Sequence, residues 1–166
     1  MTAPGHRAKP LIDVLTRSAR WKRQPRAATI VRKAVMAATQ AASTPRAELA
    51  IVLTDDSAIR ALNRTWRGYD APTNVLSFPS GAARPGSAAP HLGDIVIAFQ
   101  TVAREAKAEG KSFGHHLAHL AVHGYLHLIG HDHETDRDAR KMERLERKIL
   151  AGLGIPDPYA ERSALG

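Results

Sequence analysis

HHLAHLAVHGYLHLIGHDH, residues 115–133, holds seven of the nine histidines of this chain, which has no cysteine. If residues 115–129 form an α-helix, four histidines spaced four residues apart share one stripe: His115, His119, His123 and His127. Leucine, valine and isoleucine cover the other faces, and a helix that is apolar nearly all round is a buried helix. The stretch therefore predicts a central helix in the core, whose histidines need polar partners because an unsatisfied buried polar group is costly.

A metal ion is one partner that satisfies several imidazoles at once. We expect Gly130 to end the helix as a left-handed C′ residue, so that the chain folds back and brings His133 toward His123 and His127. Three neutral protein ligands with an open fourth position are typical of a catalytic zinc. The pattern predicts one Zn²⁺, although another divalent transition metal that accepts imidazole fits the same ligands.

The choice of ligands has an alternative, because His119 and His123 have the same spacing as His123 and His127. The glycine turn favours the second pair together with His133. The remaining histidines of the stretch are then expected to form hydrogen bonds or to orient the ligands: His115, His116, His119 and His131.

Gly124 follows the first predicted ligand, at the position where an HExxH metalloprotease carries its glutamate base. The absence of that glutamate argues against peptide hydrolysis. We also expect the glycine to leave open space beside the metal for a bulky substrate.

Length and composition favour one domain in the cytoplasm. A chain of 166 residues is long enough for one full core. No apolar run approaches the roughly 20 residues of a membrane span, and the N-terminus has no apolar signal region. The chain is therefore expected to act without a membrane.

Positive charge is concentrated at the start of the chain. Residues 1–33 contain nine Lys or Arg and one acid, Asp13, whereas the rest of the chain is balanced. A basic patch suits a phosphate backbone, and the candidates for substrate binding are Arg20, Lys22 and Arg23. A solvated segment that only aids solubility explains the charge equally well.

Periodicity predicts a β-α-β-α-β-β-α-α-α order, and hence a single α+β domain with a mixed sheet of about four strands and about five helices. Strands are expected at 11–15, 47–54, 75–79 and 92–99, and helices at 25–42, 57–66, 100–110, 115–129 and 134–150. In the last helix, Met142, Leu145 and Ile149 face inward, and its charges are expected to form a solvated face. The predicted organisation is a disordered basic tail at 1–10, one domain at 11–158 and a C-terminal tail at 159–166.

Three blocks carry a family resemblance: LNRTWRGYDAPTNVLSFP (62–79), LGDIVIAF (92–99) and HGYLHLIGHDH (123–133). In this order they closely resemble the YbeY family of bacterial metal-dependent endoribonucleases, which act in ribosomal RNA maturation and ribosome quality control. The likeness runs from about Leu11 to Pro158. The chain departs from the family at His131, where tyrosine is common, in the 80–90 loop, which is more acidic in relatives, and in its more basic N-terminal segment.

The resemblance implies a zinc site at His123, His127 and His133, and a functionally important arginine at Arg67. It also implies partners: single-stranded RNA, ribosomal RNA in the small ribosomal subunit, and an Era-type GTPase on the ribosome as a candidate. A guanidinium facing the metal would hold a phosphate with two hydrogen bonds and offset the charge that builds up in the transition state.

The resulting hypothesis is a single-strand-specific endoribonuclease in which zinc activates water, Arg67 holds the scissile phosphate, and Asn74 and Ser77 line the groove. No general base stands out, and Asp132 and Glu134 are the weaker candidates beside the zinc-activated water itself. The rival functions are a zinc hydrolase of another substrate class and a ribosome assembly factor with a structural zinc. A fourth protein ligand, such as His119 or His131, would favour the structural zinc.

Overall fold

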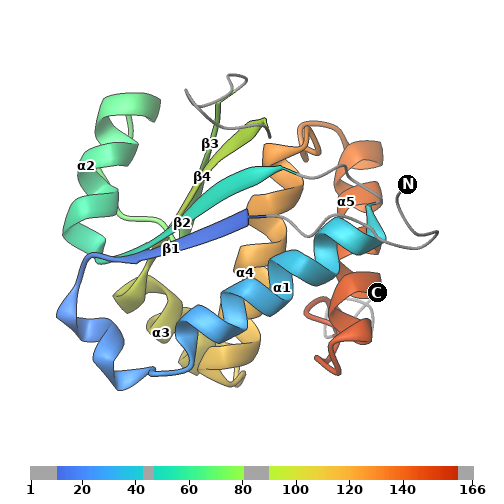
Figure 1. The fold of residues 1–166 in the computed structure, drawn as a ribbon, viewed down its shortest axis with the longest axis horizontal. Helices are drawn as coiled ribbons and strands as arrows, with labels where there is room; N and C mark the ends of the chain where they lie inside the picture. The colour runs from blue at the N-terminus through green and yellow to red at the C-terminus, as the bar shows by residue number, and fades with distance from the viewer. Residues whose placement is uncertain (1–10, 43–46, 81–89, 161–166) are drawn as a thin grey trace, which may run out of the picture.

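The computed structural model of this chain describes residues 11–42, 47–80 and 90–160 (Figure 1). The expected tail at 1–10, the helix break at 43–45 and nearly all of the 80–90 loop lie outside the described residues. The same holds for residues 161–166 of the expected C-terminal tail.

A mixed sheet of four strands is the base of the fold. Its order is β1-β2-β4-β3, where β1 is Leu11–Thr16, β2 is Glu48–Thr54, β3 is Val75–Pro79 and β4 is His91–Ala98. β2 pairs in parallel with both β1 and β4, and β3 runs antiparallel to β4 at the other edge. The predicted α+β class with a mixed four-stranded sheet is confirmed.

Five α-helices accompany the sheet, as predicted, and their ends agree with the predicted ones to within about two residues. They are α1 (Ala27–Ala41), α2 (Asp56–Arg67), α3 (Phe99–Ala108), α4 (Phe113–Leu128) and α5 (Asp136–Gly152). The periodicity did not predict a short 3₁₀ helix, η1 (Ala19–Arg23), within the basic segment. In the described ranges, no helix is long and apolar enough to cross a membrane.

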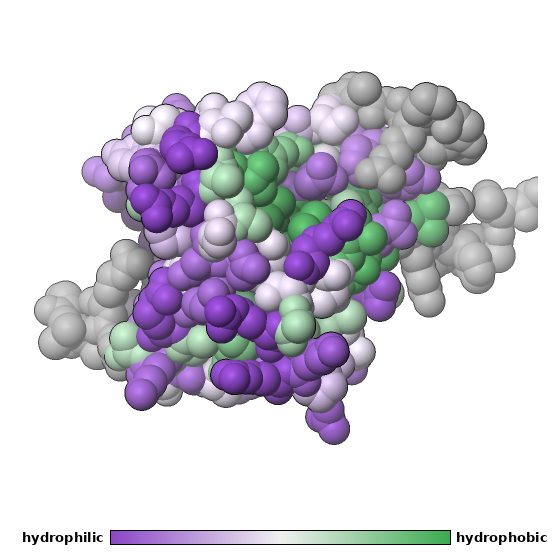
Figure 2. Space-filling view, turned by 90° about the vertical axis from the view of Figure 1, so that its left-hand side faces the viewer, coloured by the Kyte–Doolittle hydropathy of each residue, from purple (hydrophilic) through white to green (hydrophobic). Residues whose placement is uncertain are grey.

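The two faces of the sheet are covered differently. Leu49, Ile51 and Leu53 of β2, with Ile95 and Ile97 of β4, belong to the main core, which α1 and α4 complete. The alternate residues of the same strands face the other way, as a period of two requires. There they form a small second cluster under α2 alone, whose buried members are Ile59, Leu76, Val96 and Ala98. Figure 2, which looks from the α2 side, shows hydrophobic side chains gathered in a hollow of this face.

The histidine-bearing helix α4 is the central helix, as predicted. Ten of its sixteen residues are buried, and it packs against α1, α3 and α5 as well as against β3 and β4. Helices on several sides leave no face for solvent along most of its length. This is why its sequence is apolar nearly all round.

Gly124 is where α4 comes closest to the sheet. A Cβ atom added to it would lie 2.7 Å from Ile95 Cγ2 and 3.2 Å from Ser77 Oγ. The expectation that Gly124 leaves open space for substrate is therefore wrong, because side chains of β3 and β4 fill that space. Glycine is required so that the helix can approach the sheet closely.

We predict that Gly124→Ala destabilises the protein by about 1–3 kcal/mol, because the added methyl group overpacks the helix–sheet contact. Urea unfolding measures the change. Gly152→Ala is the matched control, since a Cβ there meets no atom within 4 Å, and its stability should stay within about 0.5 kcal/mol of the wild type. Equal stability of the two variants would show that the contact at Gly124 is not tight.

Candidate metal centre

The C-terminal end of α4 is built as a glycine turn. The amide of Gly130 donates to the carbonyl of His127 at 3.1 Å, and the amide of His131 donates to that of Leu126 at 2.9 Å. This pair of bonds is the Schellman motif, and Gly130 adopts the positive φ of 101° that the motif needs. The predicted helix stop at Gly130 is confirmed, and the turn directs the chain back toward α4.

Three histidines converge at this turn. One ring nitrogen from each of His123, His127 and His133 lies within 4.8 Å of the others. Nε2 of His123 and Nε2 of His127 are 3.1 Å apart. Two nitrogens bound tetrahedrally to one zinc ion at 2.0–2.1 Å would be separated by about 3.3 Å. The spacing of these side chains therefore fits a single transition-metal ion.

The protonation state of His127 also fits a metal ligand. Burial and the neighbouring imidazoles of His123 and His133 lower the pKa of His127 to about 4. His127 is therefore neutral near pH 7, and a metal binds only the neutral imidazole.

A buried carboxylate on α5 orients the first of these histidines. Glu146 is only 1% exposed, and its Oε1 accepts a hydrogen bond from Nδ1 of His123 at 2.9 Å. A proton held at Nδ1 leaves the lone pair on Nε2, the atom that faces His127. Burial raises the pKa of Glu146, but the hydrogen bonds from His119 and His123 outweigh it and lower the pKa to about 2.

The second carboxylate oxygen of Glu146 contacts His119, which lies one helical turn before His123. Oε2 pairs with Nε2 of His119 and accepts a hydrogen bond from the hydroxyl of Tyr159 at 2.7 Å. His119 thus turns toward α5 instead of toward the three converging histidines. This geometry favours the set of His123, His127 and His133 over the alternative that includes His119.

Arg67 comes to the same pocket from the other side. It is the last residue of α2, which ends at the left-handed Gly68, and it lines a pocket of about 420 Å³ together with His123, His127 and His133. Its charge contributes to the low pKa of His127. Within the described ranges, no hydrogen bond or ion pair of the guanidinium is recorded, which leaves its donors available to a ligand.

The loop after α2 is held in place so that Arg67 and β3 keep their positions. Asp70 accepts two hydrogen bonds from Arg60, at 2.8 and 3.2 Å. Asn63 is buried, and its side-chain Nδ2 donates to the backbone carbonyl of Ala71 at 2.9 Å. These three bonds tie the loop to α2, so the loop geometry follows the helix.

Comparison with known proteins decides the family. The family model of Endoribonuclease YbeY matches residues 15–154. The chain belongs to the YbeY family. An Endoribonuclease YbeY of Rhodopseudomonas palustris (strain HaA2) is 55% identical, with 95% of this chain and 85% of the relative covered. One from Bradyrhizobium diazoefficiens is 53% identical, covering 95% and 89%.

A solved structure shares the fold. The solution structure of TM1509 from Thermotoga maritima matches with a TM-score of 0.55, covering 86% of this chain and 91% of that one. The two sequences are 22% identical, so this likeness supports the α+β fold alone.

In this YbeY-family chain, two predicted groove residues line the metal pocket, but their polar groups already have partners. Asn74 donates to Glu105 at 2.8 Å and accepts from the amide of Val75 at 2.7 Å. Ser77 donates to the carbonyl of Gly124 at 2.9 Å. Both side chains tie β3 to neighbouring helices, and their contact with substrate stays a prediction.

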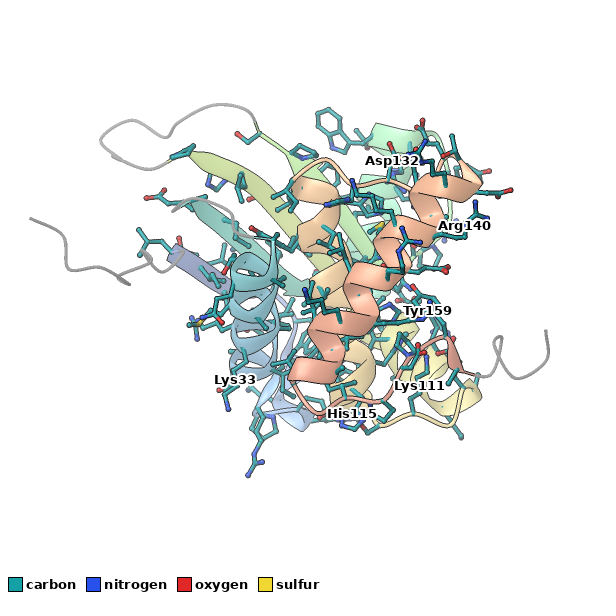
Figure 3. The ribbon with its side chains drawn as sticks, turned by 90° about the vertical axis from the view of Figure 1, so that its right-hand side faces the viewer. Lys33, Lys111, His115, Asp132, Arg140 and Tyr159 are labelled. Carbon is teal, nitrogen blue, oxygen red and sulfur yellow. The ribbon has the colours of Figure 1, made fainter. Side chains whose placement is uncertain are left out.

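The predicted basic contacts lie elsewhere. Arg20, Lys22 and Arg23 are exposed on η1, whose Trp21 packs against Phe113, the first residue of α4, with ring centroids 5.8 Å apart. From Phe113 to His127 the helix rises by about 21 Å. Figure 3 shows the two ends of the helix through its labels, with His115 near one end and Asp132 near the other. The structure therefore does not bring these three residues to the metal pocket.

Four histidines of the 115–133 stretch do not line the pocket: His115, His116, His119 and His131. His131 lies outside the converging group, although it is close in sequence, and His115 lies at the far end of α4. His116 is buried, and its Nε2 pairs with Glu105 at 2.9 Å.

Sequence reasoning missed Glu146, because the charges of the last helix were expected to form a solvated face. A signal was present in the sequence. Glu146 follows the inward-facing Met142 by four residues and precedes the inward-facing Ile149 by three, so it lies on the buried stripe of α5. A carboxylate at such a position, in a chain with a histidine-rich buried helix, indicates a partner for imidazole. Tyr159, the first residue of the expected C-terminal tail, also contacts this carboxylate.

We predict that Glu146→Gln weakens Zn²⁺ binding by about 10- to 100-fold, the usual effect of removing a group that orients a metal ligand. Isothermal titration calorimetry of the metal-free protein measures the affinity. Glu143→Gln, one turn earlier on the same helix, is the control and should bind like the wild type. Wild-type affinity in Glu146→Gln would show that the carboxylate does not orient His123.

We predict that the metal-free protein becomes less stable as the pH falls from 6.5 to 4. Unfolding returns the pKa of His127 from about 4 to its ordinary 6.5, so the unfolded chain binds more protons in this interval. The free energy of unfolding is unaffected by His127 above pH 6.5, and it falls by up to about 3 kcal/mol by pH 4. Urea unfolding with a chelator present should show a shallower pH dependence for His127→Gln. The same slope in both proteins would contradict the assignment.

Proposed function

We propose that this protein is a single-strand-specific, metal-dependent endoribonuclease that hydrolyses phosphodiester bonds in ribosomal RNA maturation and ribosome quality control. The observation that carries the proposal is one pocket lined by both the three converging histidines and Arg67. The name Endoribonuclease YbeY, carried by relatives more than 50% identical over nearly the whole chain, supports the substrate class.

His123, His127 and His133 are the proposed ligands of one Zn²⁺ ion, or of another divalent transition metal. When bound there, zinc would supply Lewis acidity and lower the pKa of water. The ligand set favours a catalytic role, because in the described part of the chain no fourth His, Asp or Glu joins the converging group. A structural zinc is usually closed by four protein ligands, so the assembly-factor alternative is disfavoured.

Residues of the chain itself bind the phosphate and orient the metal-binding histidines. Arg67 binds the non-bridging oxygens of the scissile phosphate with two hydrogen bonds and offsets the charge that develops on them. Glu146 holds a proton at Nδ1 of His123 and so keeps Nε2 available to the metal. Asp132 and Glu134, the carboxylates considered as general bases, do not line the pocket. A metal held by the three histidines would lower the pKa of the attacking water, so that a carboxylate base would not be needed.

The proposed partners are single-stranded RNA, ribosomal RNA in the small ribosomal subunit, and an Era-type GTPase, all in the cytoplasm. They follow from the family resemblance of the sequence. The rival function, a zinc hydrolase of another substrate class, would use the same histidines but would not need a phosphate-binding arginine.

We expect Arg67→Ala to keep its metal but to cut single-stranded ribosomal RNA about 100- to 1,000-fold more slowly, because one set of transition-state donors is lost. His127→Ala should lose both metal and cleavage. The measurement is gel-resolved RNA cleavage by purified protein, with bound metal quantified in each sample.

Arg144→Ala is the control, since this exposed arginine on α5 does not line the pocket, and it should cut like the wild type. Cleavage by His127→Ala without metal would refute the proposed chemistry. Equal cleavage by all the variants would identify the activity as a contaminant.

A further inference from the structure

An apolar groove in the described part of the structure is larger than the metal pocket. It has a volume of about 1050 Å³ and lies between α2 and the sheet. Its apolar lining includes Val52, Leu62, Trp66, Phe78 and Val96. This is the hollow seen in Figure 2, on the face of the sheet that α2 alone covers. An exposed apolar surface of this kind in a folded protein commonly marks a binding site.

Trp66 is the most exposed large apolar side chain that lines this groove. Its side chain is 70% exposed and is held at its edge by Phe78, with ring centroids 6.4 Å apart at an angle of 66°. The other tryptophan, Trp21, is 3% exposed and donates its indole N–H to the carbonyl of Thr54. The contrast shows that Trp66 presents an indole surface that the fold itself does not use.

The groove and the metal pocket lie next to each other and share one lining residue. Pro79 lines both, and Trp66 directly precedes Arg67 in α2, so that their Cα atoms are about 3.8 Å apart. A nucleotide next to a phosphate held by Arg67 therefore has its base within reach of the indole.

We propose that Trp66, supported by Phe78, is a stacking platform for a nucleobase next to the scissile phosphate. The inference rests on the proposed function and adds a second binding element to the same site. Stacking on an aromatic side chain needs a base that is free of a duplex, and every base has a face that can stack. The platform would thus select single strands and tolerate many sequences.

The charge at the groove is mixed, so attraction for RNA has to come from stacking and from Arg67 in the neighbouring pocket. Arg17 lines the groove, and two acidic side chains line it as well. Asp55 caps α2 by accepting from the amide of Ala58 at 3.0 Å, and Asp94 lies 3.6 Å from Nε2 of His91. Asp55 is thus held by the helix, whereas the side chain of Asp94 is 47% exposed. The neighbouring metal pocket favours RNA over a protein partner as the occupant, since a phosphate bound by Arg67 would bring a nucleotide to the groove's edge.

Tryptophan fluorescence tests the platform directly, because the chain has two tryptophans and one is buried. A ten-nucleotide single-stranded RNA of mixed sequence, added to metal-free protein, should quench the emission of the wild type. It should leave the emission of Trp66→Phe unchanged, since Trp21 is then the only emitter.

Affinity for the same RNA, measured by anisotropy of a labelled strand, should fall about 10-fold in Trp66→Ala and be restored in Trp66→Phe. Tyr69→Ala is the matched control, because Tyr69 is 71% exposed but does not line the groove. An abasic strand of the same length should bind the wild type and Trp66→Ala equally.

The results separate this inference from the proposed function, since binding is measured without metal or cleavage. Quenching by RNA in a protein that never cuts RNA would support the platform and refute the nuclease. Cleavage by the wild type together with unchanged RNA affinity in Trp66→Ala would overturn the platform, and so would absence of quenching. After either result, a protein partner would be the favoured occupant of the groove.

Discussion

Burying a helix that carries five histidines is the constraint on which this structure depends. Each imidazole removed from water needs a partner, because an unpaired buried polar group costs about 1–3 kcal/mol. The neighbouring helices supply carboxylates for this purpose. Glu105 of α3 pairs with His116, and Glu146 of α5 pairs with both His119 and His123. The partners change along the helix, from carboxylates in its middle to the converging histidines at its end.

The position of α4 relative to the sheet sets the geometry of the metal centre. Gly124 lies between His123 and His127 of the candidate metal centre, and its lack of a side chain allows contact with Ile95 and Ser77. The same contact brings β3 to the histidines, so that the edge of the sheet forms one wall of the pocket. Arg67 comes from α2, on the opposite face of the sheet. The site therefore needs both faces, and a shift of α4 would separate the ligands from the arginine.

Local features of the sequence predicted the centre of the site, and long-range packing decided the rest. The spacing of His123 and His127 and the stop at Gly130 are properties of one helix and one turn, which a four-residue period and a glycine reveal. Glu146 on α5 contacts His119 and His123 on α4. The only sequence feature that indicated this contact is the position of Glu146 on the inward-facing stripe of α5. Trp21 is buried by aromatic residues far away in sequence, and charge alone predicted either a phosphate-binding patch or a solvated segment there.

The basic segment on η1 is too far from the candidate metal centre for its charges to act on a phosphate bound there. η1 lies about 21 Å along α4 from His127, whereas the Debye length at physiological salt is about 8 Å. The charges of Arg20, Lys22 and Arg23 are thus largely screened at the pocket, and they cannot fix a phosphate there. A stacked single strand that reached both regions would span about six nucleotides at 3.4 Å each. Arg67 is the one arginine or lysine among the described residues that line the pocket, and this is why we propose it as the cation that positions the phosphate.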